Sequence, residues 1–110
     1  GAGSLNIAGA WQAIAAEGEL EREAMKAFEL DGRRLLLVHA DGRHFVVDEM
    51  CSHEDYSLAL GCVKGKRIKC SLHGSYFDLA TGEALVDPAD EPIRTYKVTV
   101  SNGKVWVDPS

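Results

Sequence analysis

The chain has 110 residues, a length that predicts one domain with a small hydrophobic core. A hydrophobic content of 45% argues against intrinsic disorder. Seventeen acidic against twelve basic side chains give a net charge of −5, which argues against nucleic acids and anionic membranes as partners. No apolar run approaches the ~18 residues that a membrane-spanning helix needs. The start of the sequence lacks the pattern of a signal peptide, so we expect a cytoplasmic protein.

Two segments near the N-terminus are expected to be strands. They cover residues 10–16 and 22–30 and flank a turn at residues 17–19. The second segment is rich in Ala, Glu and Lys, so helix propensity competes with this prediction. The spacing of Met25 and Ala27, just before the dipeptide Asp31-Gly32, favours a strand instead.

Three dipeptides predict tight hairpin turns with positive φ at both central residues. They are Asp31-Gly32, Asp41-Gly42 and Asn102-Gly103, and they punctuate expected strands at 33–40, 43–49, 93–101 and 104–108. In the last two strands the valines at positions 98, 100, 105 and 107 alternate with other side chains, which predicts one buried face. The fold class is therefore all-β and antiparallel.

The middle of the chain, from about residue 51 to residue 90, loses this alternation. Four glycines stand in it, at positions 61, 65, 74 and 82. We expect a loop-rich subdomain, about residues 49–84, that a bound group rather than a large core holds together. The base of strands would then comprise about residues 5–48 and 85–108 of a single domain.

Two cysteine–histidine pairs stand in this middle part, in the stretches CSHED and CSLHG. One residue separates Cys51 from His53, and two residues separate Cys70 from His73. Two facing loops could therefore place four ligands around a small volume. Thiolate with neutral imidazole suits zinc, or iron in a sulfide cluster. An odd number of cysteines argues against a secreted disulfide scaffold and favours a reducing compartment.

The paired motif and the longer strings CSHEDYSLALG and CSLHGSYFDLATGEAL resemble the Rieske ferredoxins that serve bacterial ring-hydroxylating dioxygenases. The resemblance extends over roughly residues 31–108. It implies a Rieske-like antiparallel β-sandwich base with a small cluster-binding subdomain. It also implies one [2Fe–2S] cluster, with Cys51 and Cys70 on one iron and His53 and His73 on the other. Gly74 and residues 86–92 would wrap the cluster.

The same resemblance implies the function of a soluble one-electron carrier that is not itself an enzyme. The carrier would take electrons from a flavoprotein reductase that uses NADH. It would pass them to a terminal dioxygenase in the breakdown of aromatic hydrocarbons. Both contacts would be transient, and we expect a monomer. No catalytic acid, base or nucleophile set remains once the four ligands are assigned.

The ligand set also bears on the redox potential. Two ferric ions, two sulfides, two thiolates and two neutral imidazoles sum to zero charge, so an electron adds more easily than to a four-cysteine cluster. High-potential relatives carry a disulfide where Tyr56 and Leu72 stand here, and a tyrosine where Phe77 stands. Ser75 fits the position of a serine that donates to the cluster in those relatives. With fewer hydrogen bonds to sulfur, we expect a potential of about −150 mV, at the low end of the Rieske range.

Three alternatives stay open. The chain could be a Rieske small subunit held permanently in a larger oxidoreductase, of the oxygenase or nitrite reductase type. It could also be a zinc-stapled structural module, although the single residue between Cys51 and His53 is shorter than the usual spacing in zinc sites. A nucleophilic cysteine would leave the second cysteine–histidine pair unexplained.

Several polar side chains lie outside the motif. Cys62 is expected to be a small filler or a free thiol without a ligand role. His39 and His44 flank the Asp41-Gly42 turn and are expected on the surface. A basic run predicts a solvated turn, with contact to a partner as the alternative; it comprises Lys64, Lys66, Arg67 and Lys69.

Overall fold

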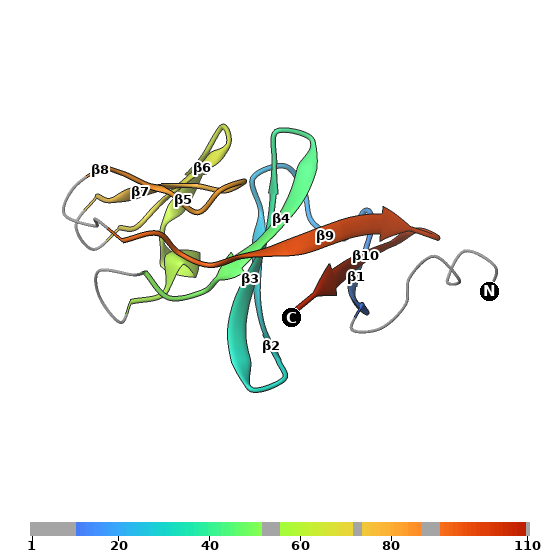
Figure 1. Ribbon diagram of the computed structural model, residues 1–110. Coiled ribbons are helices and arrows are strands. Elements are labelled where there is room, and N and C mark those ends of the chain that lie inside the picture. Colours follow the sequence, from blue (N-terminus) through green and yellow to red (C-terminus); the bar gives the residue numbers. More distant parts are fainter. Residues whose placement is uncertain (1–10, 52–55, 72–73, 87–90, 110) are drawn as a thin grey trace.

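The computed structural model describes residues 11–51, 56–71, 74–86 and 91–109. This part of the chain forms two antiparallel sheets, one of six strands in the order β1-β10-β9-β4-β3-β2 and one of four in the order β5-β6-β7-β8. The small sheet lies to one side of the long strands β3, β4 and β9, and the β1–β10 pair lies to the other (Figure 1). None of the described segments is a helix long and apolar enough to cross a bilayer.

The large sheet is built from strands near both ends of the chain, as predicted. Its strands are β1 (Gln12–Ala16), β2 (Met25–Leu30), β3 (Arg33–Ala40), β4 (Arg43–Asp48), β9 (Thr95–Ser101) and β10 (Lys104–Asp108). The strands expected at 33–40 and 104–108 have the observed bounds. The one expected at 22–30 begins three residues later, because Glu23 has a φ of 65° and lies in a turn.

The three dipeptide turns are confirmed. Asp31, Asp41 and Asn102 have φ values of 53°, 53° and 54°, and the glycine after each also has a positive φ. This backbone has the twist that antiparallel hairpins prefer. The alternation in β9 and β10 is confirmed in part: Val105 and Val107 are fully buried, whereas Val100, which pairs with Val105, is 41% exposed.

The apolar run in β3 is buried on both faces of the sheet. Leu36 and Val38 belong to the core between the two sheets, and Leu35 and Leu37 belong to a second core that β9 and β10 help to form. All four side chains have no exposed surface. A continuous apolar strand of this kind is expected where both faces are covered. β3 therefore joins the two cores of the molecule.

The middle of the chain is rich in loops, as expected, but it also contains regular structure. Four short strands form there: β5 (Cys62–Lys64), β6 (Arg67–Lys69), β7 (Tyr76–Asp78) and β8 (Ala84–Val86). Ile68, Phe77 and Leu58, the last in the 3₁₀ turn η2 (Leu58–Leu60), are fully buried against the large sheet. Strands of three residues are too short to show a period of two in the sequence.

Candidate metal centre

The first predicted ligand segment is a loop that begins where β4 leaves the large sheet. The Cys51 N–H donates to the Tyr56 carbonyl at 2.9 Å, and Met50 and Ser57 form an antiparallel bridge beside it. These contacts close the loop. Cys51 is 5% exposed, so its side chain points into the protein at the start of the loop. His53 lies outside the described residues.

The second segment repeats this arrangement after β6. The Cys70 N–H donates to the Ser75 carbonyl at 2.7 Å, and the Gly74 N–H donates to the Cys70 carbonyl at 2.9 Å. Gly74 has a φ of 75°, a conformation that glycine adopts without strain. Cys70 is 1% exposed. His73 also lies outside the described residues, as does most of the 86–92 stretch.

Cys51 and Cys70 are therefore equivalent in two ways. Each cysteine begins a loop that its own N–H closes, and both belong to the core between the two sheets. None of the three cysteines, all of which the structure describes, is in a disulfide. Two buried thiols at the start of matched loops fit a soft metal or an iron–sulfur cluster. Within the described ranges no three His, Cys, Asp or Glu side chains form a metal site, since two of the four predicted ligands fall outside them.

A buried carboxylate that the sequence did not single out supports the first loop. Glu49 is 5% exposed and accepts hydrogen bonds from Arg34 Nε at 3.0 Å, Arg34 Nη2 at 3.2 Å and Ser57 Oγ at 2.6 Å. Its carbonyl accepts from the Leu58 N–H at 2.7 Å. A buried carboxylate is stable when its lone pairs are satisfied in this way. Glu49 thereby ties the residues on both sides of the loop together, but its partners are distant in sequence and gave no local signal.

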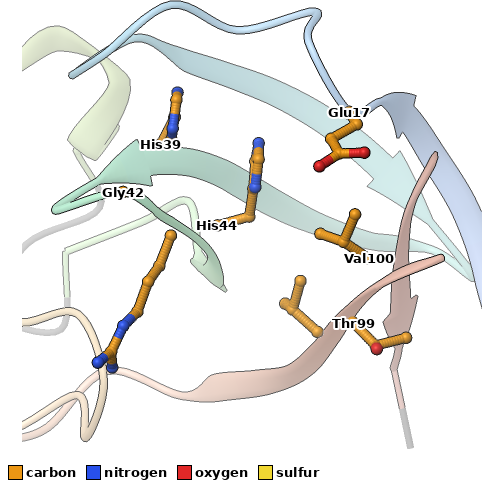
Figure 2. Close-up of a pocket in the computed structure, with 8 residues that line it drawn as sticks. Glu17, His39, Gly42, His44, Thr99 and Val100 are labelled. Carbon is orange, nitrogen blue, oxygen red and sulfur yellow. The ribbon is translucent and has the colours of Figure 1, made fainter. Parts of the chain in front are cut away.

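The two histidines that were expected on the surface are half-buried and stacked. His39 and His44 face each other across β3 and β4, with ring centroids 4.6 Å apart and an angle of 4° between the planes (Figure 2). Since a carbonyl only accepts, His39 Nδ1 donates to the Leu20 carbonyl at 2.9 Å. Among the described residues, the buried Nε2 of His44 has no hydrogen-bond partner.

This environment lowers the pKa of the His44 imidazole. Burial lowers the pKa of His44, the charge of His39 lowers it further, and Glu17 acts in the opposite direction. The pair lines a pocket of about 520 Å³ with Glu17, Thr99 and Val100 (Figure 2). None of these side chains belongs to the predicted cluster site.

The outer face of the small sheet carries Cys62 and the basic run. Cys62, Lys64, Lys66 and Arg67 are exposed, and Lys69 lies with its Nζ 5.8 Å from the centroid of the Tyr76 ring. The exposed cysteine agrees with a thiol that holds no metal. Lys64 and Arg67 face each other across β5 and β6, and neither has an ion-pair partner in the part of the chain that the structure describes. Three of the four basic side chains are therefore solvated, as expected, whereas Lys69 is half-buried.

Comparison with known proteins gives a family match over most of the chain. Residues 10–97 match the model of the Rieske [2Fe-2S] domain. The chain is 32% identical over 99 residues to the ferredoxin component of the naphthalene 1,2-dioxygenase system of Pseudomonas putida, covering 90% of this chain and 94% of that protein. It is 36% identical over 94 residues to the ferredoxin component of the p-cumate 2,3-dioxygenase system of Pseudomonas putida, covering 84% and 76% of the two chains.

The fold agrees with a solved ferredoxin. The ferredoxin of carbazole 1,9a-dioxygenase from Nocardioides aromaticivorans IC177 superposes with a TM-score of 0.87 at 27% identity, over 93% of this chain and all of that one. The two chains therefore share their fold over nearly their whole length.

Proposed function

Because this chain belongs to the Rieske [2Fe-2S] domain family, we propose that it is the electron-carrying ferredoxin of a dioxygenase system that acts on an aromatic compound. The curated relatives support this, since their names give them the role of ferredoxin component and the alignment covers nearly their whole length. The observation that carries the proposal is the matched pair of loops, each closed by the N–H of a buried cysteine. The cluster, when bound, accepts and releases one electron.

We propose that Cys51 and Cys70 hold one iron of the cluster and that His53 and His73 hold the other. The burial of both cysteines and the exposure of Cys62 support this choice among the three thiols. Buried thiolates at a metal exclude water from the iron that they bind. The backbone hydrogen bonds of the two loops hold each cysteine, and both cysteines belong to the same core, which supports one shared cluster.

The proposed partners are a terminal oxygenase, which receives the electron, and a flavoprotein reductase that uses NADH, which supplies it. The names of the relatives support the first partner, and the second follows from the resemblance alone. We further propose a cytoplasmic monomer that forms one domain, with a base of residues 5–48 and 85–108 and a cluster-binding part of residues 49–84. The net charge of −5 suits transient, electrostatically steered contacts.

Phe77 bears on the potential of the cluster. Its ring is fully buried in the core and carries no hydroxyl that could donate to sulfur. Fewer hydrogen bonds to the sulfurs leave the reduced state less stabilised. We therefore expect a midpoint potential of about −150 mV in a redox titration. A clearly positive potential would refute this prediction.

The function is tested by analysing protein purified without added metal. Iron, acid-labile sulfide and zinc are measured, and the visible spectrum is recorded before and after dithionite. Iron and sulfide in equal amounts, with colour that bleaches on reduction, are expected. Rapid reoxidation of the reduced protein by a terminal oxygenase from the same organism would then identify the acceptor. A colourless, well-folded protein with one zinc per chain would refute the proposal.

A further inference from the structure

Three arginines gather at the end of the large sheet that leads into the first loop. Arg33 and Arg34 open β3, and Arg94 directly precedes β9. They line a pocket of about 460 Å³, whose other lining residues are Asp48, Met50 and Tyr96. None of these residues is a predicted cluster ligand.

Two of the guanidinium groups lie against one aromatic ring. The Cζ atom of Arg94 is 5.3 Å from the centroid of the Tyr96 ring, and that of Arg33 is 6.0 Å from it. Tyr96 is 9% exposed, and the pairing of β9 with β4 fixes its position. Cation–π contacts hold the two positive charges near each other, although like charges repel. An anion in the pocket would offset this repulsion.

The neighbouring carboxylates are already engaged. Asp48 Oδ1 accepts a hydrogen bond from the Tyr96 hydroxyl at 2.6 Å, and Glu49 is held by Arg34 and Ser57. Three arginines against these two carboxylates leave a local charge of +1, in a chain whose net charge is −5.

Unused donors point to the kind of ligand. A guanidinium has five N–H groups. Arg33 gives one to the Pro109 carbonyl, and the Arg94 side chain has no hydrogen-bond acceptor among the residues that the structure describes. Arginine forks match the two oxygens of a carboxylate or a phosphate better than they match a spherical halide.

We propose that the pocket of Arg33, Arg34 and Arg94 binds an oxyanion, a carboxylate or a phosphate group. The anion comes either from a small ion or from an acidic side chain of another protein. Met50 lines the pocket and directly precedes Cys51, so an acidic side chain bound here would dock a redox partner beside the first loop. This last consequence rests on the proposed function, whereas binding of the anion does not.

Isothermal titration calorimetry of the full, cluster-loaded chain tests the site. The titrants are inorganic phosphate and an acetylated tetraglutamate peptide, with ionic strength held constant by sodium chloride. We expect Arg94→Gln to weaken binding about tenfold, the effect of one charge-assisted hydrogen bond at a partly exposed site. Arg33→Gln should act in the same direction. Arg43→Gln removes the same charge from an exposed residue beside the β3–β4 turn, and should change the affinity by less than about twofold because of screening.

Each outcome decides the matter. Binding of phosphate alone, with loss in Arg94→Gln, supports a site for a small ion. Binding of the peptide, with or without phosphate and with the same loss, supports a site for an acidic segment. Absence of binding in the wild type overturns the proposal. So does equal weakening in Arg94→Gln and Arg43→Gln, because net charge would then explain it. The visible spectrum of each variant reports the cluster separately, so failure of this site is distinct from failure of the proposed function.

Discussion

Three cysteines of identical chemistry stand in different environments within a short stretch of chain. Cys51 and Cys70 are 5% and 1% exposed in the core between the sheets, whereas Cys62 is exposed on the outer face of the small sheet. Burial at the start of matched loops agrees with the proposed metal ligation, and exposure agrees with a thiol that holds no metal. The side-chain environment thus distinguishes the two proposed ligands from Cys62 where residue type cannot.

Replacing one of the two proposed ligand cysteines tests this distinction. Cys51→Ser is expected to remove nearly all iron and labile sulfide, because a hydroxyl is a poor substitute for a soft thiolate. Cys62→Ser is the matched control and should keep the wild-type metal content and visible spectrum. Colorimetric iron and sulfide assays on both variants decide the outcome. A Cys51→Ser protein with full metal content would remove Cys51 from the ligand set.

His44 is expected to make stability depend on pH. Its pKa is lowered in the folded protein, so the unfolded chain binds its proton more readily. The stability that neutral His44 contributes is present above the unfolded pKa of about 6.5 and is lost as the pH falls through the lower folded pKa.

Comparison of wild type with His44→Gln isolates this effect, since both proteins share every other titrating group. Thermal midpoints measured by circular dichroism between about pH 5 and pH 8 should fall more steeply with acidification in the wild type. Parallel curves for the two proteins would show that His44 does not contribute.

Among the elements, the turn between β7 and β8 links the two sheets. Asp78 Oδ1 accepts from the Ala80 N–H at 2.8 Å and the Thr81 N–H at 3.0 Å, which closes the turn. The Ile93 N–H then donates to the Gly82 carbonyl at 2.9 Å, just before the chain enters β9. This contact brings the small sheet to the start of a long strand of the large one.

Gly82 is required in this turn by both conformation and space. Its φ is 79°, and a Cβ there would lie 2.1 Å from the Ile93 carbonyl oxygen. Gly82→Ala should therefore cost roughly 3 kcal/mol or more of unfolding free energy, from left-handed strain and overpacking together. Gly103→Ala is the control, because Gly103 has a φ of 73° with open space around its Cβ, and should cost only about 1–2 kcal/mol. Equal losses in chemical denaturation would argue against a tight contact at Gly82.

At the scale of the whole molecule, the two hydrophobic cores differ in the elements that form them. The core of Leu35, Leu37, Val46, Val105 and Val107 is formed mainly by strands of the large sheet, and the β1–β2 connection adds Leu20. The core between the sheets depends in part on strands of three residues, joined by the loops that begin at Cys51 and Cys70. A bound cluster would cross-link those loops and stabilise the second core.

Removal of the cluster is therefore expected to lower the local stability of the small sheet more than that of the large sheet. In hydrogen exchange followed by mass spectrometry, peptides from β5 to β7 of the apoprotein should exchange about tenfold faster or more, which corresponds to ~1.4 kcal/mol of local stability. Peptides from β3 and β4 should change little. Uniform acceleration across both sheets would show that the cluster stabilises the fold as a whole.

Local sequence was sufficient for the long strands and their turns. The dipeptides Asp41-Gly42 and Asn102-Gly103 and the apolar run in β3 each carry their signal within a few neighbouring residues, since turn type and strand period are local properties. The paired cysteine–histidine spacing likewise indicated the family, which the match over residues 10–97 confirms. Short strands such as β5 and β8 carry too few residues for a period to appear.

Contacts between distant residues were decided only by the tertiary structure. Sheet register brings together residues that no local pattern relates. The contacts that result are the Arg34–Glu49 ion pair, the His39–His44 stack, and the packing of Arg33 and Arg94 on the Tyr96 ring. The sequence by itself determined the all-β class, the hairpin turns and the identity of the candidate ligands. Which cysteines are buried, and where positive charge collects in an acidic chain, depended on strand pairing and packing, which are properties of the whole fold.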